Sequence, residues 1–519
     1  MTARANGFLL DRRGNFAILM SVLAVPLVLA AGVALDIANI TRTKNHLQNA
    51  LDAAVLAIAR EGKQIDDKTA IQIANAYLEN NYGLYFADLK VVRDGTTVKV
   101  DASARAEMAF GGLFGYDDWK VVTSSTADIA YMSYEIALAL DTTGSMAGGK
   151  LASLKDAVIG MVDAMSVQVD DPEKLKFAMV PFATFVNVGP QYGPTFNKKG
   201  KMVKGSGAAW LDLKGKADIP QLELKKNVSR FQVFHHLGEQ WKGCVETRMP
   251  TKKAAYDVDD IPPNKKDANS LFVPAFAIDE PDSGYANNYI ESPVNPLDKS
   301  AMGQVKKLLK YGIQDILDPV ESVLELIPVE AEIDGGKGPN RGCDMQPITP
   351  LTNDYNLIKS KVNQLQAAGT TNIMEGVAWG HRVLSPGEPF TEGATPDKVV
   401  RKILIVLTDG ANNFGNNSTA LGSEYSSFGY LVDGRLVEGG SSSTTDAMNE
   451  RTLAACTAAK NAGIELYTIR LEEPDVKTGT MLQQCATDAE HYFDAPSRSQ
   501  LDDVFQQIKE RIIVLRLAS

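Results

Sequence analysis

The sequence predicts an α/β chain with a single N-terminal transmembrane helix, a small α+β juxtamembrane unit, and then a doubly wound domain with a long insertion. Three observations lead to this prediction. Residues 16–35 are apolar and carry no charge. Residues 36–132 have the pattern of helices followed by strands. From residue 133 onward, short apolar strands alternate with helices, a pattern typical of a parallel sheet covered on both faces.

The overall composition excludes several classes of protein. The 519 residues carry a formal net charge of −11, whereas non-specific nucleic-acid binding requires a basic surface that neutralises phosphates. Hydrophobic residues make up 44% and charged residues 23% of the chain, an ordinary globular balance. We therefore expect a folded protein that does not bind nucleic acid, rather than a disordered chain or a polytopic membrane protein.

The apolar segment at residues 16–35 is long enough to cross a bilayer. At a rise of about 1.5 Å per residue, such a helix spans roughly 30 Å, the thickness of the hydrocarbon core. Arg4, Arg12 and Arg13 precede it, which favours a cytoplasmic N-terminus at residues 1–15. A cleaved signal peptide would have a shorter apolar region of about 7–15 residues, although the small residues at 30–34 leave cleavage open. A buried soluble helix is disfavoured because the segment is apolar on every face.

Residues 36–132 predict the small α+β unit. Apolar residues with helical spacing continue to Glu61, and a second helix is expected at 66–82. Strands are expected on both sides of Asp94-Gly95, a strong hairpin signal, at 89–92 and 97–102. A further strand is expected at 121–131.

The alternating strands and helices define a domain at residues 133–519. Strands are expected at 135–140, within 175–188, at 402–407 and at 464–471. Helices are expected at 150–165, near 353–368, after Asn372 and at 498–513. Residues 189–345 are too long for a structureless connection, so we expect an inserted subdomain there. A smaller insertion at about 412–445 contains Asp433-Gly434, which predicts a second hairpin.

The four cysteines form an even set, which fits two disulfides in an exported domain. Among the connectivities that four cysteines allow, chain proximity favours Cys244 with Cys343 and Cys456 with Cys485. Buried free thiols are the alternative. No CxxC pair occurs, so a zinc site is not expected.

Three loops rich in oxygen ligands leave the predicted sheet at the edge where α/β proteins bind their ligands. Carboxylate and hydroxyl oxygens are hard ligands that suit Mg²⁺, Mn²⁺ or Ca²⁺. Each loop taken alone has a structural interpretation, as a turn or a helix cap. Their order in the chain and their common edge together predict a metal site. The side chains that would form it are Asp141, Thr143, Ser145, Thr371 and Asp409.

These residues resemble the metal-ion-dependent adhesion site of von Willebrand factor A (vWA) domains. The run Asp141-x-Thr143-x-Ser145 corresponds to the family's D-x-S-x-S, with a Thr in place of the middle Ser. Asp409 lies in the family's context of an apolar strand followed by TDG. The resemblance covers roughly 133–188 and 346–515. It implies a Rossmann-like vWA fold for 133–519, with the five residues holding a metal that accepts an acidic side chain from a partner.

The N-terminal region is similar to the TadE/TadG-like proteins of the tight-adherence (Flp) pilus machinery. The similarity is carried by short runs at residues 13–17, 35–36, 48–59, 241–248 and 343–352. It implies that 16–35 is a membrane anchor and that 36–132 is a TadE/TadG-like periplasmic region. Prepilin-like relatives carry Glu five residues beyond the Gly, where this chain has Leu19, so processing at Gly14 is not expected.

The two resemblances imply a single-pass protein of the bacterial inner membrane, with most of the chain in the periplasm. It would be a non-enzymatic component of Flp pilus assembly that binds a partner protein, such as another Tad pilus-assembly protein, through Mg²⁺ or a similar ion. A released or surface-exposed vWA adhesin for a host or matrix protein is a second interpretation. A chelatase-like vWA partner of an ATPase is a third.

The sequence does not match the motifs of nucleotide-binding proteins or of enzymes that were compared with it. The glycine-rich loop before Lys150 follows a strand and opens a helix, but Leu151 stands where a P-loop needs Ser or Thr. The five histidines lack metal-ligand spacing, and no nucleophile elbow occurs. We therefore expect neither nucleotide binding nor catalysis.

Overall fold

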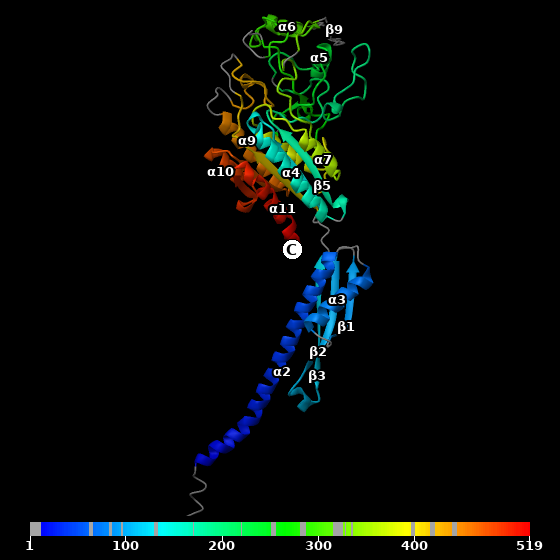
Figure 1. Ribbon diagram of the computed structural model, residues 1–519, viewed down its shortest axis with the longest axis vertical. Coiled ribbons are helices and arrows are strands. Elements are labelled where there is room, and N and C mark those ends of the chain that lie inside the picture. The colour runs from blue at the N-terminus through cyan, green and yellow to red at the C-terminus, as the bar shows by residue number, and fades with distance from the viewer. Residues whose placement is uncertain are drawn as a thin grey trace, which may run out of the picture. The chain divides into compact units, whose positions relative to one another are not determined.

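The computed structural model (Figure 1) divides the chain into two compact units, Met1–Tyr131 and Met132–Ser519. It describes residues 12–518 apart from 62–65, 83–85, 95–96, 129–132, 170, 220, 251–255, 281–286, 315–324, 327–328, 334–335, 396–399, 416–420 and 438–443. Most of the expected cytoplasmic N-terminus and Gly95 of the expected hairpin turn lie outside these residues.

The first unit begins with one long helix, α2 (Arg12–Glu61), which contains the predicted transmembrane segment. Pro26 lies inside it, at a position that a membrane-spanning helix would tolerate. The described part of the chain has one helix long and apolar enough to cross a membrane, within Met20–Ala59. Large apolar side chains on several of its faces are exposed, including those of Val22, Leu23 and Leu27. The expected N-terminal apolar helix is confirmed.

The rest of the first unit is the expected small α+β structure. Helix α3 (Asp67–Tyr82) is followed by β1 (Phe86–Asp94), β2 (Thr97–Glu107) and β3 (Asp118–Asp128). The strands form an antiparallel sheet in the order β1-β2-β3. One face of this sheet packs on the two helices, and the shared core consists mainly of Leu47, Leu51, Val55, Ile58, Ala70, Ala74, Leu78, Val98, Val100, Ala102 and Ala104.

The second unit is built on a six-stranded sheet in the order β10-β5-β4-β11-β12-β13. Continuous apolar runs form its centre, because strands buried on both faces have no polar side. The predicted α/β class is confirmed. The strands are β4 (Ser133–Asp141), β5 (Leu175–Phe182), β10 (Thr349–Thr352), β11 (Val400–Thr408), β12 (Glu465–Leu471) and β13 (Tyr492–Ala495).

The sheet differs from the expected parallel sheet at one edge. Strand β10 runs antiparallel to β5, whereas the other neighbouring strands are parallel. The reason lies in how the chain returns to the sheet after the long insertion. Asn187, just beyond β5, pairs with Pro347, just before β10, and Ile348 N donates to Asn187 O. The insertion therefore leaves the sheet and returns to it at the same end of β5. Strand β10 begins at that end, so it must run antiparallel to β5.

Helices cover both faces of this sheet, and side chains alternate along β4 to meet them. Ile136, Leu138 and Leu140 face a core that includes α4 (Gly149–Gln168), α7 (Tyr355–Asn363) and α11 (Leu501–Ala518). Ala137 and Ala139 face the other core. That core includes side chains from α8 (Ile373–Leu384), α9 (Thr444–Asn461) and α10 (Val476–Cys485).

The long insertion has little regular structure and packs around aromatic side chains. Its described elements are α5 (Arg230–His236), β6 (Val245–Glu246), β7 (Val273–Pro274), α6 (Ala301–Lys310), β8 (Ile313–Gln314) and β9 (Glu325–Leu326). Figure 1 shows α5 and α6 beyond one end of the sheet. The ring of Phe272 lies 4.9 Å from that of Trp379 on α8. The core of the long insertion is therefore continuous with the core of the sheet domain.

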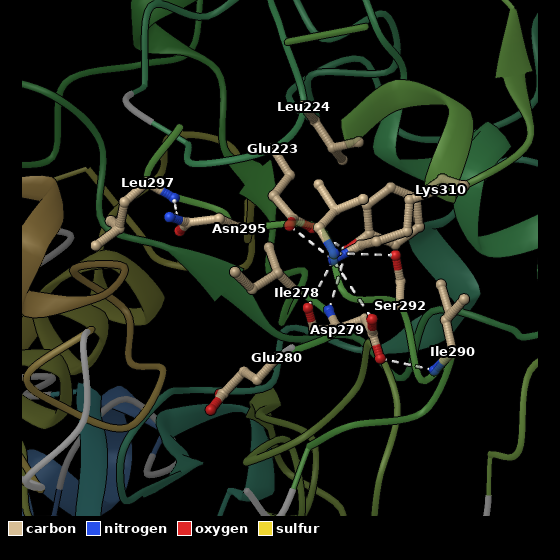
Figure 2. A network of polar contacts seen from close by, with 12 residues as sticks. Glu223, Leu224, Ile278, Asp279, Glu280, Ile290, Ser292, Asn295, Leu297 and Lys310 are labelled. Carbon is tan, nitrogen blue, oxygen red and sulfur yellow. Dashed lines mark hydrogen bonds and ion pairs between the residues drawn. The ribbon is translucent and has the colours of Figure 1, made fainter. Parts of the chain in front are cut away.

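A buried ion network lies inside the insertion (Figure 2). The ammonium of Lys310, at the end of α6, donates to Glu223 Oε1 and to the backbone O of Asp279, each at 2.7 Å. It also lies 3.4 Å from Asp279 Oδ2, and all three side chains are fully buried. Tyr311 Oη donates to the other oxygen of Glu223. One cation thus contacts residues 31 and 87 positions away in the chain, in a region with few hydrogen bonds between strands.

The smaller insertion does not form the hairpin expected at Asp433-Gly434. Residues Leu431–Asp433 form a 3-10 turn, and Gly434 ends it in the left-handed conformation with φ 67°. Asp433 Oδ2 accepts from the backbone N of Tyr430 and closes the turn. An Asp-Gly pair favours a hairpin but also suits such a turn. Here the buried side chain of Tyr430 packs into the insertion and favours the 3-10 turn.

Both expected disulfides are present. Cys244 pairs with Cys343 within the long insertion, and Cys456 on α9 pairs with Cys485 at the end of α10. The described cysteines include no free thiol.

Candidate metal-binding site

Asp141 and Asp409 emerge side by side because their strands are parallel neighbours. Asp141 ends β4 and Asp409 follows β11, and the two strands pair in register up to Leu140 and Leu407. Thr143 N donates to Asp141 Oδ1 at 2.8 Å, and Thr408 Oγ1 donates to Asp141 Oδ2 at 2.6 Å. Burial, together with the nearby charge of Asp409, raises the pKa of Asp141 to about 6. Two carboxylates are thus held together in a buried, electronegative position.

The first loop carries its hydroxyls toward Asp409. Residues Gly144–Met146 form a single 3-10 turn after β4, which places Thr143 and Ser145 on the same side. Their hydroxyl oxygens are 3.0 Å apart, and Ser145 Oγ donates to Asp409 Oδ1 at 2.6 Å. The loop is therefore bonded directly to the residue that follows β11.

The loop with Thr371 closes the site from the side of β5. Gly144 N donates to Gly369 O at 3.0 Å, which joins this loop to the first. A Cβ added to Gly410 would lie 3.5 Å from Thr371 Oγ1 and 3.7 Å from Ser145 Oγ, so these two hydroxyls flank Gly410. Gly369 has φ 82°, and a Cβ there would meet Thr184 Oγ1 at 2.7 Å. The three loops therefore bring all five predicted residues to one sheet edge.

Lys150 is a further member of this site that was not predicted from the sequence. It lies in the first turn of α4, and its Nζ donates to Asp409 Oδ2 at 2.7 Å. Asp409 is fully buried at this contact and the Lys150 side chain is 20% exposed. In the sequence, this lysine matches only part of a phosphate-binding loop, since Leu151 follows it. The signal that could have placed it here is its position in the first turn of α4, directly after the loop that carries Thr143 and Ser145.

The donor set fits a hard divalent cation. Two carboxylates and three hydroxyls converge, and such oxygens suit Mg²⁺, Mn²⁺ or Ca²⁺. Within the described ranges, no group of three or more His, Cys, Asp or Glu side chains has the geometry of a metal site. A cation at this edge would therefore depend on hydroxyl ligands, and it would share Asp409 with Lys150.

Comparison with known families finds a match in the N-terminal segment. Residues 14–61 match the family described as putative Flp pilus-assembly TadE/G-like. The N-terminal segment is therefore similar to that family. It contains most of α2, including the whole predicted membrane anchor. The TadE/G-like match supports a pilus-associated role for the chain. No curated relative matches the sequence.

Several solved structures resemble the fold at low identity. The pilus adhesin SpaC from Lactobacillus rhamnosus GG is 12% identical with a TM-score of 0.31, covering 82% of this chain and 33% of its own. This chain therefore spans about a third of SpaC. The vWF domain of the type V pili tip protein Mfa5 from Porphyromonas gingivalis is 10% identical, with a TM-score of 0.35 and coverages of 74% and 96%. The PilB minor pilin from Streptococcus sanguinis is 12% identical, with a TM-score of 0.33 and coverages of 84% and 79%.

Proposed function

We propose that this chain is a non-enzymatic, single-pass component of tight-adherence (Flp) pilus assembly in the bacterial inner membrane, with most of its residues in the periplasm. The observation that carries this proposal is the TadE/G-like match, which coincides with the one described helix apolar enough to cross a membrane. The two disulfides support a periplasmic location, because disulfides persist in oxidising compartments.

The proposed binding site is the sheet edge with the five oxygen ligands, Asp141, Thr143, Ser145, Thr371 and Asp409. A bound Mg²⁺, Mn²⁺ or Ca²⁺ would offer an open coordination position to an acidic side chain of a partner, such as another Tad pilus-assembly protein. The hydroxyl of Ser145, itself bonded to that of Thr143, orients Asp409, and the hydroxyl of Thr408 orients Asp141. Lys150 supplies a local positive charge that would also favour an approaching carboxylate.

Complementation of a deletion strain tests this function. We expect the parent chain to restore pili on the cell surface, and Asp409→Asn to reach the membrane in equal amount without restoring them. Asp163→Asn is the matched control, since Asp163 lies on α4 in an exposed pair with Lys359. Full piliation with Asp409→Asn would contradict a role for the site, and piliation without the chain would contradict the assembly function.

Fractionation of the same cells separates this function from that of a released adhesin. We expect the full-length chain in the membrane fraction after washing with carbonate. A shortened chain in the medium, beginning near Ala34, would instead favour the released adhesin.

A further inference from the structure

Hydrogen bonds fix the loop between β2 and β3 at a defined position along helix α2. The carboxylate of Asp36 accepts the backbone N–H groups of Ala109, Phe110 and Gly111, at 2.7, 3.1 and 2.8 Å. Asp36 is 4% exposed, so these bonds are shielded from water. Asn39 Nδ2 adds a bond of 2.7 Å to the backbone O of Glu107. The loop is therefore bonded to the first turn of α2 that follows the apolar segment 16–35.

The contact continues onto the apolar segment itself. The ring of Phe110 packs so closely on Gly32 that a Cβ at this glycine would lie 2.4 Å from the ring. Only a residue without a side chain fits there. Figure 1 shows β2 and β3 running alongside α2, with their connecting loop toward its N-terminal half. Because the unit is compact, the position of the loop relative to the end of the apolar segment is set by these contacts.

The same loop exposes large apolar and aromatic side chains. Leu113 is 70% exposed, Phe114 60%, Tyr116 59% and Trp119 52%. Leu113 and Phe114 belong to the 3-10 helix Gly111–Phe114, and Trp119 lies at the start of β3. So many exposed apolar groups on one short loop indicate a surface that meets another apolar phase.

We propose that this loop and the start of β3, residues 110–119, enter the outer interface of the bilayer that α2 would cross. The inference rests on the membrane anchor of the proposed function. Trp and Tyr concentrate at the boundary between lipid and water, where their rings lie in an apolar layer and their polar atoms meet water. Contacts with Asp36 and Gly32 hold the loop beside the end of the apolar segment, where the boundary between lipid and water would lie.

The position of the loop at the end of the apolar segment favours lipid, rather than a protein, as the partner of its exposed side chains. A protein could bind these side chains at any distance from the membrane, whereas lipid can meet them only at the end of the transmembrane segment. The loop would act as a second contact with the membrane and would limit tilting of the first unit.

Quenching of tryptophan fluorescence by brominated lipids tests the inference. The full chain is placed in nanodiscs whose lipids carry bromine either near the headgroup or near the end of the acyl chain. The other three tryptophans, Trp210, Trp241 and Trp379, are at most 5% exposed. Subtracting the signal of Trp119→Phe therefore isolates Trp119. We expect strong quenching of Trp119 by the headgroup-proximal bromine and weaker quenching by the deeper one.

Two tryptophans introduced into the Trp119→Phe background complete the design. Thr126→Trp places the probe on the same strand, about 23 Å farther along at about 3.3 Å per residue, and should not be quenched. Leu27→Trp places it inside the anchor and should be quenched by the deeper bromine. If the probe introduced by Leu27→Trp is quenched and Trp119 is not, the loop does not contact lipid and the inference is overturned. If neither is quenched, the anchor itself is wrong and the inference is overturned with it.

Discussion

The ammonium of Lys150 lies 2.7 Å from Asp409 Oδ2, at the sheet edge where Asp141, Thr143, Ser145 and Thr371 converge. Asp409 is buried, and its other oxygen accepts from Ser145. The lysine is therefore the nearest charge that balances this carboxylate. A metal ion bound at the proposed site would therefore compete with this ammonium for one oxygen of Asp409.

Lys150→Met should destabilise the protein in the presence of EDTA. The buried Asp409 would lose its ion partner, at a cost of about 1–3 kcal/mol. The same variant should bind Mg²⁺ more tightly than the parent, because the competing ammonium is gone. Thermal unfolding with EDTA and with Mg²⁺ measures both effects, and Lys155→Met on the same helix is the control. A variant with parental stability in EDTA would show that the ion pair contributes nothing.

Lys310→Met should weaken the long insertion strongly. It would leave Glu223 and Asp279 buried without their shared cation, and breaking such a buried pair costs about 3–5 kcal/mol. Limited proteolysis and chemical unfolding of the full chain measure the loss. Lys306→Met is the control, since Lys306 lies on the exposed side of the same helix. Equal resistance of both variants to protease would contradict the role given to the buried network.

Removal of the disulfide between α9 and α10 should lower stability without altering the sheet. Replacing Cys456 and Cys485 by Ser opens a loop of sequence separation 29, which predicts a loss of about 2–4 kcal/mol. The comparison is made by urea unfolding against the parent, with Cys244 and Cys343 left paired. If the double variant unfolds at the same urea concentration as the parent, this disulfide does not stabilise the fold.

The stability of the domain should depend on the charge of His491. Its Nε2 lies 2.9 Å from Glu465 Oε1 and its Nδ1 lies 2.6 Å from Asp488 Oδ1. Burial alone would lower the pKa of His491, but hydrogen bonds to the two carboxylates outweigh it and raise this pKa. The stabilisation is therefore fully present below the unfolded value of about 6.5 and is lost as the pH rises through the higher folded value.

Unfolding of the parent and of His491→Gln between about pH 5.5 and 8.5 measures this contribution. The difference in unfolding free energy should be largest at the acidic end and should shrink as the pH rises. Other titrating groups are common to both proteins, so the difference isolates His491. A difference that stays constant over this range would contradict a raised pKa.

Local patterns were enough to predict the elements that position the candidate site. The apolar runs of β4, β11 and β12 lack a polar side, which marks central strands, and the oxygen-rich loops follow two of these strands directly. The N-terminal apolar helix and the hairpin of β1 and β2 were also predicted, since length and turn chemistry determine them locally. Both disulfides followed from the even number of cysteines and their order in the chain.

Features that depend on distant contacts could not be predicted in this way. The reversed direction of β10 follows from where the insertion re-enters the sheet, and this appears in no local pattern. The ion pair of Lys150 joins residues 259 positions apart. Asp36 belongs to one of the runs that carry the TadE/TadG-like resemblance, but no local pattern indicates that its carboxylate binds a loop more than seventy residues away. The turn at Asp433 was predicted wrongly because Asp-Gly fits both a hairpin and a 3-10 turn.

Titration of Mn²⁺ and Mg²⁺ into the full chain in nanodiscs, by calorimetry, tests the proposed metal site most directly. The account predicts one bound ion per chain in the parent, and none in Asp141→Asn or Asp409→Asn, with circular dichroism unchanged in both variants. Binding of equal strength in the parent and both variants, or no binding in the folded parent, would contradict it.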